Sequence, residues 1–286
     1  MKRTHLNIED IFNIPTAVIY NPDAFKSIYH VSIDSRVIKK NTLFIAVKGE
    51  RFDGHDFINE AVKKGAVAVI VNEKNFKNLS EIDIPVINVK DTKKALGDAA
   101  KIWRSKLKAK IIGITGSAGK TTTKEILAVL FSEKFKVNKT IANNNNHIGV
   151  PLTILNTNEK HNILVAELGT NHFGEIPYTV RILSPDFALI TNIGDSHLEY
   201  FKNRKGVLKE KSALFNETIK RNGKIFINND DKLLKEIGKK IKNKITFALN
   251  ESADYKAKII GYDKLAMPHI VIKNKKKLFD AVLPVI

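Results

Sequence analysis

Short apolar runs alternate with polar turns along the first hundred residues. Three of these runs predict buried strands, at residues 43–47, 66–71 and 86–89. Residues 57–64 predict a helix, because their apolar positions recur at helical spacing and Gly65 follows as a stop signal. A second helix is predicted to begin after Asp91 or Thr92, either of which can cap it, and to end near residue 107.

From residue 111 the pattern changes to a strand at 111–115, a glycine turn at 116–120 and a helix at 121–135. The buried stripe of this helix is predicted to contain Ile126, Leu127 and Leu130. Apolar runs predict later strands at residues 163–168, 187–193, 224–228 and 245–248, and the stretch from Tyr255 alternates like further strands. Helical segments between the strands indicate parallel βαβ units with helices on both faces of the sheet.

These patterns predict an α/β protein of two domains. A small N-terminal α/β substrate domain is expected over residues 1–107, with its boundary in the lysine-rich stretch 106–110. A central domain is expected over residues 108–286, with a mostly parallel sheet covered by helices and a phosphate-binding loop. A length of 286 residues is comfortable for two domains of ~100–200 residues each.

The composition removes several classes of protein. A hydrophobic share of 43% with 27% charged residues is that of a globular chain. The chain has no cysteine, which excludes a disulfide scaffold, a thiolate zinc site and a cysteine nucleophile. No apolar run approaches the ~20 residues that span a bilayer, and the N-terminus lacks the apolar core of a signal peptide. A cytoplasmic protein without membrane insertion is expected.

The net charge of +18 is unusual and uneven, with 21 basic and 9 acidic residues from position 201 onward. Such an excess attracts polyanions, including nucleic acid. The alternative is solvated lysine on exposed faces, which we favour because runs such as 273–277 have no interleaved aromatic residues for base stacking. No nucleic-acid partner is therefore expected.

The strongest chemical signal is a glycine-rich turn between a predicted strand and a predicted helix. Gly116 and Gly119 let backbone N–H groups turn toward phosphate oxygens, and the helix N-terminus adds partial positive charge. Lys120 can reach the β- and γ-phosphates, and the Thr121 hydroxyl can ligate Mg²⁺. Because Ile114 stands five positions before Gly119, this loop is shorter than G-x-x-x-x-G-K-[ST]. The expected nucleotide-binding residues are Gly116, Ser117, Ala118, Gly119, Lys120, Thr121 and Thr122.

Three further residues invite a chemical interpretation. Glu167 lies at the carboxyl end of a predicted strand, where doubly wound sheets place ligands, and can hold Mg²⁺; the alternative is a surface or capping glutamate. His197 follows another strand end, although a lone histidine is more often structural. Lys211, taken alone, is a charge clamp or a solvated lysine.

Four ordered segments resemble the Mur ligase family. Thr115 to Glu125, reading TGSAGKTTTKE, resembles the family's ATP-binding loop. The other segments that are similar to family motifs are residues 143–151, residues 167–176, and residues 191–201 together with 210–215. Residues 32–36 and 48–57 resemble the family's nucleotide-sugar-binding domain. The block 167–176 is most similar to the subgroup that joins D-alanyl-D-alanine to UDP-MurNAc-tripeptide through an acyl phosphate.

The resemblance implies a role for individual residues. It implies catalytic roles for Lys120, Glu167, His197 and Lys211, and Mg²⁺ binding by Thr121, Glu167, His197 and Lys211. It further implies that Lys211 is carbamoylated; Lys209 lies two residues away, but the match of Lys-Ser-Ala-Leu-Phe favours Lys211. The residues implied to bind the UDP-muramyl substrate are Ser35, Arg36, Lys48, Asn143, Asn145 and Asn146.

The resemblance also sets expectations for the whole protein. The cofactors implied are ATP and Mg²⁺, the pathway is peptidoglycan synthesis, and a monomer is expected. The chain stops where the family's third domain should begin, so the C-terminal ligase domain is expected to be absent and ligation by this chain alone to be weak. The alternatives are a ligase that adds a diamino acid, a related wall-peptide ligase, or a non-catalytic protein that binds UDP-sugars or polyanions.

Overall fold

The computed structural model describes residues 4–78, 82–275 and 277–282. Its contacts divide the chain into two compact units. The first unit contains Met1–Ala109 and Phe135–Leu164, and the second contains Lys110–Lys134 and Val165–Ile286. Within the described residues, no helix combines the length and the apolar character needed to cross a membrane.

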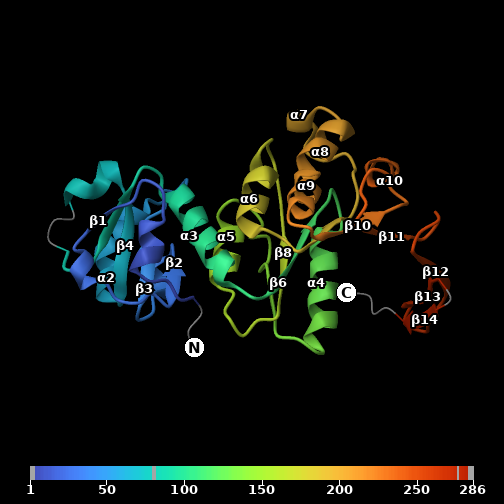
Figure 1. Ribbon diagram of the computed structural model, residues 1–286, viewed down its shortest axis with the longest axis horizontal. Helices are drawn as coiled ribbons and strands as arrows, with labels where there is room; N and C mark the ends of the chain where they lie inside the picture. Colours follow the sequence, from blue (N-terminus) through green and yellow to red (C-terminus); the bar gives the residue numbers. More distant parts are fainter. Residues whose placement is uncertain (1–3, 79–81, 276, 283–286) are drawn as a thin grey trace. The chain divides into compact units, whose positions relative to one another are not determined.

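The first unit is built on a five-stranded sheet in the order β1-β5-β4-β3-β2 (Figure 1). Only the edge strand β1 runs antiparallel to its neighbour; the other pairs are parallel. The strands of the unit, including one outside this sheet, are β1 (Val18–Tyr20), β2 (His30–Ser32), β3 (Thr42–Ile45), β4 (Ala66–Asn72), β5 (Val86–Val89) and β7 (Val137–Lys139). Its α-helices are α1 (Ile8–Phe12), α2 (Ile58–Lys63), α3 (Thr92–Lys106) and α5 (Gly149–Leu155). Its 3-10 helices are η1 (Pro22–Ala24), η2 (Ser35–Val37), η3 (Gly54–Phe57) and η4 (Glu73–Asn78).

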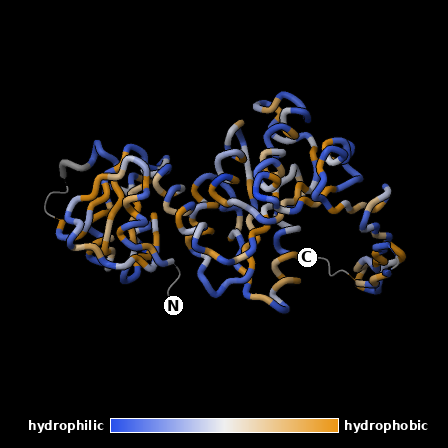
Figure 2. The backbone as a smooth tube through the Cα atoms, viewed as in Figure 1, coloured by the Kyte–Doolittle hydropathy of each residue, from blue (hydrophilic) through white to orange (hydrophobic). Residues whose placement is uncertain are grey.

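The core of this unit follows from the sequence pattern. The strands β3 and β4 are apolar almost throughout and largely buried, as expected where parallel strands are covered on both faces (Figure 2). Asp91 caps α3 by accepting hydrogen bonds from the backbone N–H groups of Lys93 and Lys94. Gly65 ends the turn after α2 with a φ of 108°, which side-chain-bearing residues rarely adopt.

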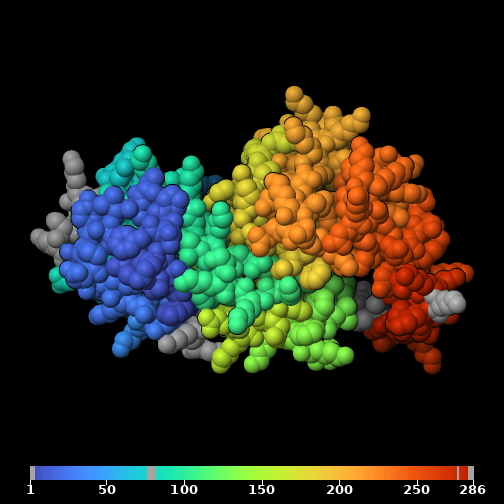
Figure 3. Space-filling model, viewed as in Figure 1, coloured from blue at the N-terminus to red at the C-terminus, as the bar shows by residue number. Residues whose placement is uncertain are grey.

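The second unit carries the strand–turn–helix pattern expected from residue 111. Its strands lie in the order β14-β13-β12-β11-β10-β9-β6-β8, with parallel pairs from β6 to β12 and an antiparallel meander from β12 to β14. They are β6 (Lys110–Thr115), β8 (Ile163–Glu167, which begins in the first unit), β9 (Phe187–Ile190), β10 (Lys224–Asn228), β11 (Lys244–Ala248), β12 (Tyr255–Tyr262), β13 (Pro268–Asn274) and β14 (Lys277–Val282). The helices are α4 (Lys120–Ser132), α6 (Glu175–Leu183), α7 (Leu198–Phe201), α8 (Arg204–Lys211), α9 (Ala213–Lys220) and α10 (Lys232–Gly238). The meander, red in Figure 3, forms one edge of this unit.

The predicted fold class is confirmed, with mostly parallel sheets in an α/β architecture. One detail of helix α4 is wrong: Leu130 was expected on the buried stripe but is 63% exposed. The buried positions of this helix are Lys124 and Ala128, one turn apart. The stripe is therefore rotated away from Leu130, and a lysine occupies one of its buried positions.

Candidate functional site

The glycine turn between β6 and α4 is held by the segment that follows β9. Asn192 accepts a hydrogen bond from the Ala118 N–H at 3.1 Å and donates one to the Ala118 carbonyl, also at 3.1 Å. Its own carbonyl accepts from the Ser117 N–H, and the Thr191 hydroxyl donates to the Ala118 carbonyl. These contacts fix the turn where α4 begins.

The first N–H groups of a helix have no partner within the helix. At the start of α4 these groups belong to Lys120, Thr121 and Thr122. The helix is 13 residues long and contributes partial positive charge at this end. Together the fixed turn and the open end of the helix form an arrangement suited to phosphate oxygens.

Substitution by alanine is expected to have very different effects at the two glycines of the turn. A Cβ on Gly116 would lie 1.9 Å from the Thr191 Oγ1, whereas a Cβ on Gly119 meets nothing within 4 Å. We expect Gly116→Ala to displace the turn and to lower the free energy of unfolding by about 2 kcal/mol. Gly119→Ala should cost only the ~1 kcal/mol of its left-handed backbone, with φ at 76°. Denaturant titrations of the two variants check this order, which equal losses of stability would contradict.

Glu167 lies at the carboxyl end of β8 and contacts the first turn of α4. Its Oε2 accepts a hydrogen bond from the Thr121 hydroxyl at 3.0 Å. The Lys124 Nζ lies 3.7 Å from the same oxygen and 3.2 Å from Glu125 Oε1. Glu167 is 1% exposed and Lys124 is 0% exposed, so these charges face each other out of solvent.

The two lysines expected to be catalytic lie in different surroundings. Lys120 donates a hydrogen bond from Nζ to the Gly116 carbonyl at 3.0 Å, which folds its side chain back over the turn. Lys211, at the end of α8, is 2% exposed. The pKa of Lys211 is lowered from 10.5 to about 8, first by burial and then by the positive charge of Lys120, while Glu210 acts in the opposite direction. A far larger share of neutral amine is therefore present near pH 8 than for an ordinary lysine.

The depressed pKa of Lys211 predicts a pH dependence of stability. Between pH 8 and 10.5 the unfolded chain holds a proton on this lysine that the folded chain has released. Stability rises with pH wherever the unfolded state binds more protons. We expect the free energy of unfolding of the wild type, relative to Lys211→Met, to rise by at least about 1 kcal/mol across this window, since one pKa unit corresponds to ~1.4 kcal/mol. Urea titrations at several pH values measure it, and a flat or falling difference would contradict it.

The loop after β8 is held by two carboxylates. Glu210, on α8, accepts the N–H groups of Gly174 and Ile176 at 2.9 and 2.8 Å, which satisfies the N-terminus of α6. Glu175 accepts the N–H groups of Asn171 and His172. Burial raises the pKa of Glu175, but these backbone hydrogen bonds, together with the Thr170 side chain and the charge of His172, leave that pKa lowered.

His197 stands at the start of α7 with a left-handed backbone, at φ 51°, and is exposed. Its ring lies edge-on to Phe201 with the ring centroids 6.3 Å apart. Among the described residues no three His, Asp or Glu side chains are grouped so as to hold a metal ion. The local pair suited to Mg²⁺ is the buried Glu167 carboxylate with the Thr121 hydroxyl beside it. This pair fits a cation that also takes ligands from nucleotide phosphates and water.

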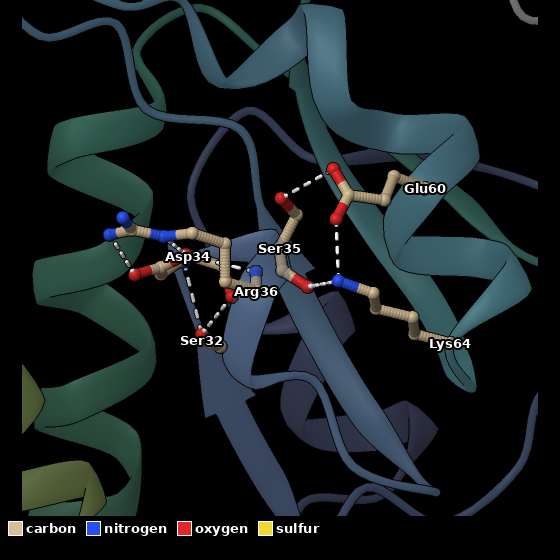
Figure 4. A network of polar contacts seen from close by, with 6 residues as sticks. All are labelled: Ser32, Asp34, Ser35, Arg36, Glu60 and Lys64. Carbon is tan, nitrogen blue, oxygen red and sulfur yellow. Dashed lines mark hydrogen bonds and ion pairs between the residues drawn. The ribbon is translucent and has the colours of Figure 1, made fainter.

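The first unit contains a polar network around the start of η2 (Figure 4). Ser35 is 6% exposed and donates a hydrogen bond to Glu60 Oε2 at 3.0 Å. Lys64 contacts the other oxygen of Glu60 at 2.5 Å and donates to the Ser35 carbonyl. Arg36 forms a two-pronged ion pair with Asp34, and the Arg36 side chain holds the pKa of that carboxyl below its usual value. Ser35 and Arg36 are thus already bonded within the unit.

A cavity of about 310 Å³ lies in the first unit, between the first sheet and α5. Its polar lining residues are His30, Ser32, Asp34, Lys39, Thr42 and Asn156. Ser35, Arg36 and Lys48 do not line it. The exposed Lys48 side chain lies 4.0 Å from Asp53, which also contacts His55. The hydrogen-bond donors and acceptors of the cavity therefore include Asp34 but none of the three predicted substrate residues Ser35, Arg36 and Lys48.

The asparagine run precedes α5, in the first unit. Asn146 Oδ1 accepts the N–H groups of Ile148 and Gly149 at 3.0 and 2.9 Å, so this side chain caps the helix. The Asn145 N–H donates to the Asn143 carbonyl, and the Asn143 side chain is exposed. A Cβ on Gly149 would lie 2.2 Å from the Asn144 carbonyl oxygen, which explains glycine at that position.

Sequence reasoning missed several residues that shape these sites. Asn192 and Thr191 hold the glycine turn before α4, and Glu210 caps α6. Their contacts join segments far apart in the chain, which no local spacing reveals. Lys124 was missed as well, because the burial of its helical face, which it shares with Ala128, is seen only in the structure.

Two family profiles match the chain. Residues 114–284 match the Mur ligase middle domain, and residues 27–104 match the Mur ligase family catalytic domain. Curated relatives include UDP-N-acetylmuramoyl-tripeptide--D-alanyl-D-alanine ligases from Haemophilus influenzae, 41% identical over 81% of this chain, and from Bacillus subtilis, 39% identical over 82%. The chain spans about half the length of these curated relatives, 50% in both cases.

Solved structures show the same likeness. MurF from Acinetobacter baumannii superposes with a TM-score of 0.86 at 30% identity, over 99% of this chain and 62% of that one. MurF ligase from Thermotoga maritima, solved in complex with ADP, gives a TM-score of 0.79 at 32% identity, over 88% of this chain and 57% of that one.

Proposed function

The chain belongs to the Mur ligase family, and from that premise we propose that it is the substrate-binding and ATP-binding part of a MurF-type ligase. Such an enzyme transfers the γ-phosphoryl group of ATP to the terminal carboxylate of UDP-MurNAc-tripeptide, which releases ADP. The amine of D-alanyl-D-alanine then attacks the acyl phosphate, so that a peptide bond forms and phosphate leaves. This reaction would place the protein in cytoplasmic peptidoglycan synthesis.

The observation that carries the proposal is the contact between Thr121 and Glu167 beside the phosphate-binding turn. In the proposed mechanism the N–H groups at the start of α4 and the Lys120 ammonium bind the phosphates. Thr121 and Glu167 would hold Mg²⁺, which would neutralise charge on the transferred phosphoryl group. Catalysis then comes from positioning and charge stabilisation rather than from a general base.

The remaining expected residues enter the proposal with narrower roles. His197 and a carbamoylated Lys211 would supply further ligands to Mg²⁺. Carbamoylation requires a neutral amine to attack CO₂, and the pKa of about 8 at Lys211 supplies that form. In the first unit, the cavity beside Asp34 is the proposed site for part of the UDP-muramyl substrate, with Ser35, Arg36, Lys48 and the asparagine loop as further contacts. Asn146 contributes to that site by holding the loop, since its side-chain oxygen caps α5.

Thermal unfolding with ligands tests the substrate. We expect UDP-MurNAc-tripeptide at ~100 times its dissociation constant to add about 2.7 kcal/mol of stability. UDP-GlcNAc serves as the control, because it shares the nucleotide but lacks the peptide. A shift with the tripeptide ligand that UDP-GlcNAc does not reproduce supports the proposal. An unchanged transition with UDP-MurNAc-tripeptide, together with salt-sensitive binding to DNA, would instead favour a polyanion-binding protein.

A further inference from the structure

Lys124 is a buried charge that the proposed mechanism does not use. Its side chain is fully buried, on the α4 stripe that also contains Ala128. Its ammonium lies 3.2 Å from Glu125 Oε1 and 3.7 Å from Glu167 Oε2. A buried ammonium is tolerated only where it is paired, so these two carboxylates explain how Lys124 can occupy the stripe.

The pairing also constrains Glu167. The terminal torsion of a glutamate side chain has a broad energy profile, so its contacts decide how the carboxylate is rotated. Here Oε2 faces two groups near the N-terminal end of α4, the Thr121 hydroxyl and the Lys124 ammonium. Thr121 and Lys124 are three residues apart and lie on the same helix face. One oxygen of Glu167 is thereby fixed to the helix that begins at the phosphate-binding turn.

We propose that Lys124 is a positioning residue, whose ammonium, anchored by Glu125, holds the Glu167 carboxylate in the orientation in which it binds the divalent cation of a bound nucleotide. This inference rests on the proposed function and deepens it. Glu125 is part of the arrangement because its oxygen is the nearer partner of the ammonium. Lys124 and Glu125 come from one turn of α4, and Glu167 comes from the end of β8.

A purely electrostatic role for Lys124 predicts the opposite effect. An ammonium 3.7 Å from a carboxylate oxygen repels a cation that approaches the same group. Its removal alone should therefore strengthen Mg²⁺ binding. If the ammonium instead positions the carboxylate, its removal should weaken Mg²⁺ binding, because Glu167 then rotates away from the required orientation. The sign of the change separates the two roles.

The experiment measures the coupling between Mg²⁺ and ADP. Calorimetry gives the dissociation constant of ADP in the presence of Mg²⁺ and in the presence of EDTA. The coupling is the constant in EDTA divided by the constant with Mg²⁺. We expect Lys124→Met to reduce this ratio at least tenfold while the constant in EDTA changes less than threefold. Lys124→Arg, which restores a cation at the same place, should return the ratio to within threefold of the wild type. Lys134→Met, at an exposed lysine just after α4, is the matched control.

A second variant decides the question if Lys124→Met does not fold, as judged by circular dichroism. Glu125→Gln removes the anchor at a side chain that is 32% exposed, and we expect it to reduce the coupling at least threefold. A ratio that is unchanged or increased in the folded variants, with normal coupling in the wild type, overturns the positioning role alone. Absence of Mg²⁺-dependent ADP binding in the wild type overturns the proposed function and this inference with it.

Discussion

Replacing Lys120 with methionine is expected to weaken ADP binding about 100-fold in the presence of Mg²⁺. Lys120 is the first residue of α4, and its Nζ contacts the Gly116 carbonyl. The ammonium therefore already lies beside the turn at which the phosphates of ADP are proposed to bind. A hydrogen bond to a charged group contributes ~1.5–3 kcal/mol, and the lost cation also leaves the phosphates less well neutralised. Methionine keeps an unbranched side chain, so the change removes the charge with little change in volume.

Isothermal calorimetry with ADP and Mg²⁺ measures this effect. Lys134→Met is the appropriate control, because it removes one positive charge from an exposed position just beyond the same helix. A Lys120→Met variant that binds ADP within threefold of the wild type would show that the phosphates are held elsewhere, and the proposed nucleotide site would be wrong. Equal losses in both variants would point to net charge rather than to a specific contact.

Replacing Trp103 with alanine is expected to lower the free energy of unfolding of the first unit by about 4 kcal/mol. The indole is 1% exposed, on α3, and its Nε1 donates a 2.7 Å hydrogen bond to the Thr157 carbonyl. Truncation of a buried aromatic residue leaves a cavity and costs ~3–5 kcal/mol. The variant also leaves a buried carbonyl without this donor.

Trp103→Phe separates the two contributions, because phenylalanine fills most of the volume but cannot donate the hydrogen bond. We expect it to lose about 1–2 kcal/mol. Trp103 is the only tryptophan of the chain, so the titrations require far-ultraviolet circular dichroism rather than tryptophan fluorescence. A loss below 1 kcal/mol for Trp103→Ala would mean that this contact does not hold residues 135–164 to the rest of the unit.

The contact of Trp103 bears on how the chain is divided. The sequence places one boundary in the lysine-rich stretch 106–110, and the contacts also divide the chain after Ala109. They further assign residues 135–164 to the first unit, although 135–164 follows the phosphate-binding turn and α4 along the chain. No local pattern could indicate that residues 135–164 belong to the first unit, because this depends on side chains such as Trp103 that contact a segment some fifty residues away.

The sequence predicted helices and strands well where their limits depend on residues next to one another in the chain. The run 224–228 is β10 with the predicted bounds, and Asp91 caps α3 as its side chain allows. The run 43–47 predicted a strand that ends earlier, at Ile45, although Ala46 still bonds to the carbonyl of Ile70. A strand ends where its pairing with the neighbouring strand ends. Its own sequence does not specify that position.

The sequence by itself determined the α/β class and the strand–turn–helix around Gly116–Lys120. These features follow from apolar periodicity, from glycine and from the helix N-terminus, all of which act over a few residues. Only the tertiary structure decided that Lys124 is buried against Glu167, that Leu130 is exposed and that Asn192 braces the turn. Each of these depends on a partner from another element, because burial and pairing are set by which helix and strand faces meet.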